Sequence, residues 1–178
     1  MIRRLGAADL RQIERHYLGL SVEDRRYRFN TPLSDSAIRA RIASFDWRAT
    51  TLIGYFNGKT LRGVAELATL KGDMTDAGEV ALSVDGAHRR RGIARRLVTE
   101  AAAQARALGC RRLVFWWHPE NVGFARFLTA CGGRIFAHPP AGWLEIPAAG
   151  ARLLPFASVA GASARHIQGP TVRNGHAA

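Results

Sequence analysis

The segment EVALSVDGAHRRRGIA, residues 79–94, decides the fold, because it holds a short strand, an arginine-rich loop and the start of a helix. Apolar residues alternate with smaller ones over residues 79–84, which is typical of a β-strand. Apolar residues then recur at helical spacing over residues 91–108, and Gly109 is expected to end that helix. Residues 112–117 form a continuous apolar run of strand length, as in a strand buried on both faces. The order strand, helix, strand predicts one parallel βαβ unit.

The rest of the chain adds strands and helices on both sides of this unit. The dipeptide Asn57-Gly58 is a strong hairpin signal between two β-rich segments, residues 51–56 and 61–70. Periodicity and capping residues predict the other elements: a strand at 2–5, helices at 10–18, 21–28, 34–45 and 121–131, and a pair of strands at 134–137 and 142–146. The expected helix caps are Ser21, Ser34 and Asn121. The predicted fold class is therefore α/β, in the form of a mixed α+β sheet with flanking helices.

Length and composition predict one folded domain. The chain has 178 residues, 47% of them hydrophobic, and we place the domain at residues 1–147. Residues 148–178 contain no acids and are rich in Ala, Gly and Arg, so we expect a poorly ordered tail there. The longest strongly apolar run, residues 113–117, is too short to cross a membrane.

Cysteine usage and the N-terminus predict a cytoplasmic protein. Cys110 and Cys131 are too few and too far apart for a disulfide framework or a zinc cluster, and we interpret both as core residues. The six histidines show no metal-ligand spacing, so no metal site is predicted. The basic N-terminus is not followed by the apolar stretch of a secretory signal.

Positive charge is concentrated around the loop of the βαβ unit. Lys plus Arg number 26 against 14 Asp plus Glu, a net charge of +12, and residues 88–112 contain eight arginines and one acid. Such a segment attracts polyanions. A helix start also offers unpaired N–H groups, and the small residues Gly92 and Ala94 let an anion approach the backbone. The loop lacks the GKS or GKT ending of a P-loop and the pattern GxGxxG, so the predicted phosphate ligand is of another kind.

The run Arg89-Arg90-Arg91-Gly92-Ile93-Ala94 resembles the coenzyme A pyrophosphate loop of the GCN5-related N-acetyltransferase (GNAT) superfamily, whose signature is Gln or Arg, two residues, Gly, one residue, then Gly or Ala. Four further segments resemble parts of that superfamily: the fourth strand (79–84), the central helix (91–108), the fifth strand (113–117) and the second cofactor-binding segment (121–133). The resemblance covers about residues 50–146, and residues 20–29 look like a segment common in bacterial members.

This resemblance implies a fold and a cofactor. The fold is a mostly antiparallel, twisted central sheet flanked by helices, in which the fourth and fifth strands splay apart and acetyl coenzyme A (acetyl-CoA) lies between them. The pantetheine arm would pair with the backbone of residues 82–84. The cofactor-binding residues implied in this way are Leu82, Ser83, Val84, Arg89, Arg90, Arg91, Gly92, Ile93, Ala94, Arg95 and Asn121.

Direct acetyl transfer to an amine requires a base, because only the neutral amine attacks the thioester. Glu79, at the start of the fourth strand, is the carboxylate best placed for this role. The alternative is that Glu79 is a solvated strand-end charge or forms a salt bridge to an arginine. Backbone N–H groups of the same strand could stabilise the oxyanion that forms during transfer.

The proton donor to the leaving thiolate is not evident. Many members of the superfamily carry a Tyr seven residues after the Asn of the second segment, but this chain has Leu128 there. Three outcomes follow: water assists the thiolate, another donor such as His118, Tyr55 or Tyr27 substitutes, or the protein binds the cofactor without efficient transfer. His118 follows the fifth strand and is the favoured substitute, the alternative being an ordinary loop residue.

Two functions are consistent with these residues. The first is an N-acetyltransferase that moves an acetyl group from acetyl-CoA directly to a primary amine, on a protein lysine or a small molecule. Neither cysteine has the surroundings of an activated thiolate, so no acyl-cysteine step is predicted. The second is a non-catalytic coenzyme A sensor, or a basic module that binds nucleic acid or protein. We expect an acidic protein surface as partner rather than nucleic acid, and either a monomer or a homodimer.

Overall fold

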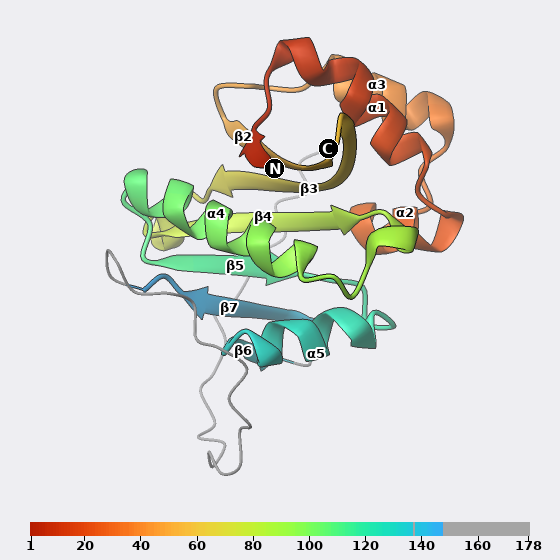
Figure 1. The fold of residues 1–178 in the computed structure, drawn as a ribbon. Helices are drawn as coiled ribbons and strands as arrows, with labels where there is room; N and C mark the ends of the chain where they lie inside the picture. The colour runs from red at the N-terminus through yellow and green to blue at the C-terminus, as the bar shows by residue number, and fades with distance from the viewer. Residues whose placement is uncertain (137, 148–178) are drawn as a thin grey trace, which may run out of the picture.

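A seven-stranded sheet with helices packed against it forms the part of the chain that the computed structural model describes, residues 1–136 and 138–147 (Figure 1). The strands lie in the order β1-β2-β3-β4-β5-β7-β6. The strands are β1 (Ile2–Arg4), β2 (Thr50–Asn57), β3 (Thr60–Thr69), β4 (Ala77–Val84), β5 (Arg112–Trp116), β6 (Arg134–Phe136) and β7 (Ala141–Glu145). The α-helices are α1 (Leu10–Leu18), α2 (Val22–Phe29), α3 (Asp35–Ala43), α4 (Ile93–Ala107) and α5 (Val122–Ala130). The predicted tail lies outside the described residues.

Strand pairing confirms the predicted mixed sheet. β4 and β5 run parallel and are joined by α4, which is the expected βαβ unit. All other neighbouring strands in the described part of the chain pair antiparallel. The predicted hairpin is β2 and β3, and Gly58 adopts a φ of +58° at its turn. None of the helices among the described residues is long and apolar enough to span a membrane.

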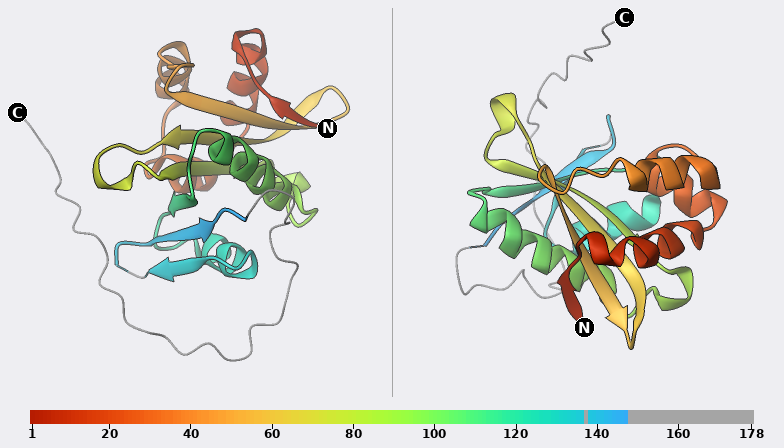
Figure 2. Two further views of the ribbon diagram at one scale, coloured as in Figure 1. Left: turned by 90° about the vertical axis from the view of Figure 1, so that its left-hand side faces the viewer. Right: turned by 90° about the horizontal axis from the view of Figure 1, so that it is seen from above.

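Two apolar clusters, one on each face, hold the helices on the sheet. Leu97 and Ala101 of α4 are fully buried on one face against strand residues such as Val80. On the other face, α1 and α3 pack through fully buried side chains, among them Ile13 and Ile38. Burial of each large apolar side chain stabilises the fold by about 1.5–3 kcal/mol. Seen from above, the strands run between α4 on one side and α1, α2 and α3 on the other (Figure 2).

Several predicted element boundaries shift by one or two residues, and two of these shifts have backbone reasons. α4 begins at Ile93 rather than residue 91, because Arg90 and Gly92 have positive φ values that are not helical. β4 begins at Ala77 rather than residue 79, because its first residues already pair with both β3 and β5. Three short 3-10 helices, η1 (Ala7–Asp9), η2 (Gly72–Met74) and η3 (Gly86–His88), were not predicted.

Candidate active site

The strands β4 and β5 part before β4 ends. Their parallel pairing covers three residues of each strand and stops at Glu79 opposite Val114, although β4 continues to Val84. Beyond that point β4 pairs with β3 and β5 pairs with β7. We call this interruption of the pairing, flanked by the carboxyl-terminal halves of β4 and β5, the β4–β5 gap. Ligands of sheets that contain parallel strands bind at such strand ends.

Backbone groups of β4 point into the gap at alternate residues. Hydrogen bonds at both ends of β4 show that its odd-numbered residues direct their N–H and C=O groups to β3. The even-numbered residues Leu82 and Val84 therefore direct theirs towards β5, which does not pair with them. Two of the three strand residues predicted to meet the pantetheine thus present backbone groups to the gap.

The third strand residue, Ser83, faces elsewhere. It stands opposite Val64 in the ladder with β3, and its Oγ lies 2.8 Å from Nε2 of His16 in α1. Burial lowers the pKa of His16 to about 4, so the ring is neutral at pH 7 and the bond joins two uncharged groups. Ser83 therefore fixes α1 to the sheet, and neither its backbone nor its hydroxyl points into the gap.

The helix α4 begins without a cap at the open end of the gap. Gly92 stands at the N-cap position with a φ of +74°, and a Cβ added there would meet no atom within 4 Å. Ser21, Ser34 and Asn121 cap α2, α3 and α5 with side-chain hydrogen bonds, whereas α4 has neither a side-chain cap nor an acid in its first turn. Because the first N–H groups of a helix lack partners within it and carry partial positive charge, the start of α4 suits an anion.

The three arginines before this helix take different positions. Arg89 donates from Nε to the C=O of Val84 at 3.2 Å and from Nη2 to a carboxylate oxygen of Asp24 in α2. Arg90 and Arg91 are exposed. Arg90 has a φ of +58°, a left-handed conformation that costs a residue with a side chain about 1–2 kcal/mol. Such strain is typical of ligand-binding turns.

The first turn of α4 divides its side chains between the core and the surface. Ile93 is buried in the cluster beneath the helix, and its side chain faces away from the solvent. Ala94 and Arg95 are partly exposed. The contribution of this turn to an anion site therefore comes from its backbone and from its positive charge.

Hydrogen bonds hold the turn that leads from β4 to these arginines. Asp85 accepts from the N–H of Ala87 through Oδ1, and its Oδ2 lies 2.8 Å from Nη1 of Arg62 in β3. Nδ1 of His88 lies 3.5 Å from the same Oδ2. Burial alone would raise the pKa of Asp85, but these donors outweigh it and lower that pKa. The turn η3 is thus tied to the sheet by an ionised carboxylate.

Glu79 lies where the gap begins, on the face of the sheet opposite α4. Its neighbour Val80 packs beneath α4, and successive side chains of a strand point to opposite faces. Burial raises the pKa of the Glu79 carboxyl, the charge of Arg28 opposes this rise, and the charge of Glu66 adds to it. A half-buried carboxylate with a raised pKa is a stronger base than an exposed one.

A buried carboxylate on the same face, Glu66 in β3, is absent from the residues predicted. It joins three helices to the sheet: Tyr17 of α1 donates to Oε1 at 2.8 Å, and guanidinium nitrogens of Arg28 and Arg41 lie at 2.6 and 2.9 Å. Burial alone would raise the pKa of Glu66, but the two arginines outweigh it and lower that pKa. The available signal was an acidic residue inside the mostly apolar strand segment GVAELA, residues 63–68.

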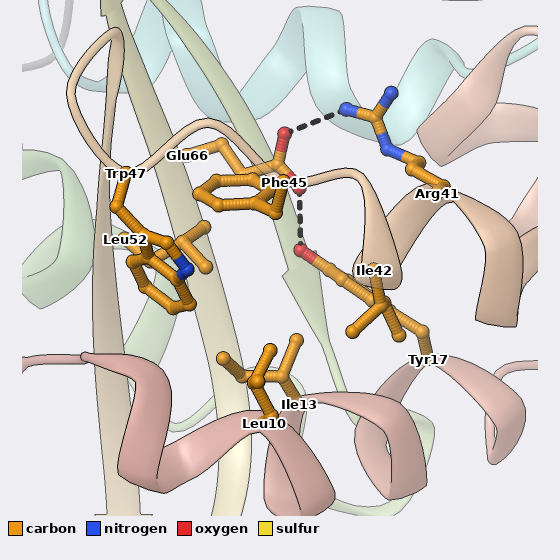
Figure 3. Close-up of a pocket in the computed structure, with 9 residues that line it drawn as sticks. All are labelled: Leu10, Ile13, Tyr17, Arg41, Ile42, Phe45, Trp47, Leu52 and Glu66. Carbon is orange, nitrogen blue, oxygen red and sulfur yellow. Dashed lines mark hydrogen bonds and ion pairs between the residues drawn. The ribbon is translucent and has the colours of Figure 1, made fainter.

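A small pocket between α1, α3 and the sheet ends at this carboxylate. Figure 3 shows Tyr17 and Arg41 bonded to Glu66, with Leu10 and Ile13 of α1 on the opposite wall. The pocket has a volume of about 10 Å³, the room that one water molecule needs. It is therefore part of the packing of α1 and α3 and too small for an acceptor.

The structure brings His118 to the gap but not Tyr55. The His118 ring centroid lies 5.8 Å from that of Tyr27 in α2, and Nδ1 accepts from the N–H of Glu120 at 3.3 Å, which leaves Nε2 as the ring N–H. Tyr55 belongs to β2, two strands away from β4. Leu128 is fully buried in the core, so no proton donor stands at that position.

The structure also places Asn121 and the two cysteines. Asn121 caps α5 by accepting from the N–H of Phe124 at 3.1 Å, as expected of a helix cap. Cys110 and Cys131 are buried, which confirms their interpretation as core residues, and burial raises the pKa of both thiols. Among the described residues, no group of three or more His, Cys, Asp or Glu side chains could hold a metal ion.

Comparison with known proteins places this geometry in a family. The family described as "Acetyltransferase (GNAT) family" matches residues 9–132, which is more than half of the chain. No curated protein matches the sequence.

Solved structures share the fold. The GNAT domain of PAT from S. lividans is 24% identical, with a TM-score of 0.70 over 81% of this chain and 89% of that one. A ribosomal-protein-S5-alanine acetyltransferase from Vibrio fischeri is 16% identical, with a TM-score of 0.63 over 83% and 93%. A GNAT superfamily phosphinothricin acetyltransferase from Sinorhizobium meliloti, solved in complex with acetyl-CoA, is 18% identical, with a TM-score of 0.63 over 82% and 88%. These likenesses confirm the expected fold.

Proposed function

The chain belongs to the acetyltransferase (GNAT) family, and we propose that it transfers the acetyl group of acetyl-CoA to a primary amine through the β4–β5 gap. It is an acyl-CoA-dependent N-acyltransferase with acetyl-CoA as its cosubstrate. This assignment favours the enzyme over the non-catalytic alternatives. The observation that carries the location of the site is that the β4–β5 pairing ends at Glu79, towards the same end of the sheet where the uncapped α4 begins.

The residues at this end fit acetyl-CoA. The open space over Gly92 and the N–H groups of the first turn of α4 suit a pyrophosphate, and the exposed Arg90 and Arg91 add positive charge beside it. The backbone groups of Leu82 and the N–H of Val84, which do not pair with β5, would hold the pantetheine amides, much as an added strand would, while the C=O of Val84 accepts from Arg89. Bound acetyl-CoA supplies the activated thioester, and the chain supplies the base and a hydrogen-bond donor to the leaving sulfur.

We assign the role of general base to Glu79. Its raised pKa makes it a better proton acceptor than an exposed carboxylate, and it stands where the pairing of β4 and β5 ends. Among the described residues no ion pair joins Glu79 to an arginine, whereas Arg28 is paired with Glu66. This favours the catalytic role over the salt-bridge alternative. Glu79 would take the proton of the acceptor ammonium directly or through one water.

We assign to His118 the role of hydrogen-bond donor to the leaving thiolate. With Nδ1 accepting from the backbone, its Nε2–H can stabilise the leaving sulfur, and the second proton of the amine nitrogen passes to that sulfur as the tetrahedral intermediate collapses. Tyr27 is the nearby alternative, but its hydroxyl donates to Glu23 at 2.8 Å, and this bond raises the pKa of Tyr27. Because the Tyr27 hydroxyl is already engaged with Glu23, we favour His118.

We propose a lysine on an acidic protein surface as the acceptor. The net charge of +12 steers such a surface towards this enzyme. The chain carries only 14 acids against 26 basic residues, a balance that disfavours a polyamine, which is the main small-molecule alternative. The cytoplasm, which contains acetyl-CoA and keeps thiols reduced, is the proposed location.

A release assay for free coenzyme A with matched acceptors tests this function. One lysine peptide carries acidic flanks, a second carries the same lysine between basic flanks, and spermidine and free amino acids complete the set. We expect the highest kcat/KM for the acidic peptide, with a decline as salt is added. Higher kcat/KM for spermidine or the basic peptide would contradict the acceptor class. The absence of turnover with every amine would contradict the enzyme, and the Glu79→Gln variant supplies the background rate.

A further inference from the structure

The helix α2 connects the two loops that border the β4–β5 gap. Asp24 binds Arg89, which follows β4. Arg26 pairs with Glu120, and the ring of Tyr27 lies against that of His118, both in the segment after β5. Figure 1 places α2 at the end of the sheet where β4 ends and α4 begins.

Arg89, which binds Asp24 of α2, is also the first arginine of the predicted pyrophosphate loop, residues 89–94. Arg89 gives its Nε to the C=O of Val84 and its Nη2 to Asp24, so its guanidinium is turned towards α2. The side chain of Asp24 is 17% exposed and that of Arg89 is 48% exposed, so an incoming anion can reach the arginine while the aspartate is mostly covered. A carboxylate and a phosphate compete for the same donors of one guanidinium.

We propose that Asp24 competes with the pyrophosphate of acetyl-CoA for Arg89, and that acetyl-CoA binding therefore releases the first turn of α2. This rests on the proposed function, in which the start of α4 holds acetyl-CoA.

Paired variants measured by calorimetry with acetyl-CoA test the competition. Asp24→Asn removes the competitor, and Glu23→Gln is the matched control, since it removes the same charge from the same turn but contacts Tyr27 instead of Arg89. We expect Asp24→Asn to tighten binding about two- to fivefold, the effect of removing a weak surface ion pair, and Glu23→Gln to leave it unchanged. In the Arg89→Gln background Asp24→Asn should have no effect.

Equal effects of the two acidic variants, or weaker binding by Asp24→Asn, would overturn the proposal. Hydrogen exchange gives a second readout: acetyl-CoA should speed exchange of amides in residues 22–26 and leave α3 unchanged, whereas slower exchange in residues 22–26 would overturn the release of α2. Failure of the unaltered protein to bind acetyl-CoA at all would instead contradict the proposed function, and this inference with it.

Discussion

Gly92→Ala should show how Gly92 contributes to acetyl-CoA binding, apart from its contribution to the stability of the turn before α4. The change adds one methyl group at a φ of +74°, into space where it meets no protein atom. The positive φ lowers stability by about 1–2 kcal/mol, whatever binds there. The methyl group also blocks the approach of a phosphate to the first N–H groups of α4. Loss of one hydrogen bond to a charged group, about 1.5–3 kcal/mol, weakens acetyl-CoA binding about 10- to 150-fold.

Gly109→Ala is the matched control at the other end of α4. Gly109 is exposed, has a φ of +85°, and a Cβ there would also meet nothing within 4 Å. We expect both variants to lose similar thermal stability and only Gly92→Ala to lose affinity in a calorimetric titration. Unchanged affinity of Gly92→Ala, or an equal loss in both variants, would refute the assignment of the phosphate site to the start of α4.

Three further substitutions test the other assignments. Glu79→Gln should lower kcat and remove the acidic limb of the pH–rate profile without changing the Kd of acetyl-CoA; an unaltered profile would return Glu79 to a structural role. Because burial raises the pKa of Glu79, its stabilising contribution exists at low pH and is lost as the carboxyl ionises, so Glu79→Gln should be at least as stable as the parent at pH 7 in thermal unfolding. Glu66→Gln leaves Arg28 buried without a countercharge, so urea unfolding should show a loss of about 3–5 kcal/mol at pH 7. The pKa of Glu66 is lowered, so the parent should lose this contribution as the pH falls below about 4, and a constant difference between parent and variant down to pH 3 would contradict the role of the charge. His118→Gln should lower kcat, again with unchanged Kd, and more than Tyr27→Phe does; the opposite order would make Tyr27 the donor.

Local features of the fold could be predicted because neighbouring residues determine them. Ser21, Ser34 and Asn121 were expected to cap helices, and each accepts a hydrogen bond from the third residue after it. The β2–β3 hairpin follows from Asn57-Gly58 in the same way. The start of α4 was misplaced, because the left-handed conformation of Arg90 has no signal in its residue type.

Features that depend on contacts between distant segments were harder to predict from the sequence. The residue pattern predicts that β4 and β5 are strands. Their separation was expected only from the family resemblance, because strand pairing depends on both strands and their neighbours. Glu66 was missed because its partners come from three helices distant in sequence. Ser83 was named as a cofactor residue and Tyr55 as an alternative donor, because the sequence shows neither the hydrogen-bonding direction of Ser83 nor the distance of its strand from that of Tyr55.

Calorimetric titration of the unaltered protein with acetyl-CoA at moderate salt, with a nonspecific DNA duplex as control, tests the central claim most directly. Saturable binding of one acetyl-CoA per chain that changes little with salt, without comparable DNA binding, is the predicted result. Absence of acetyl-CoA binding, together with salt-sensitive binding of DNA, would contradict the acetyl-CoA site at the β4–β5 gap and assign the basic surface to nucleic acid.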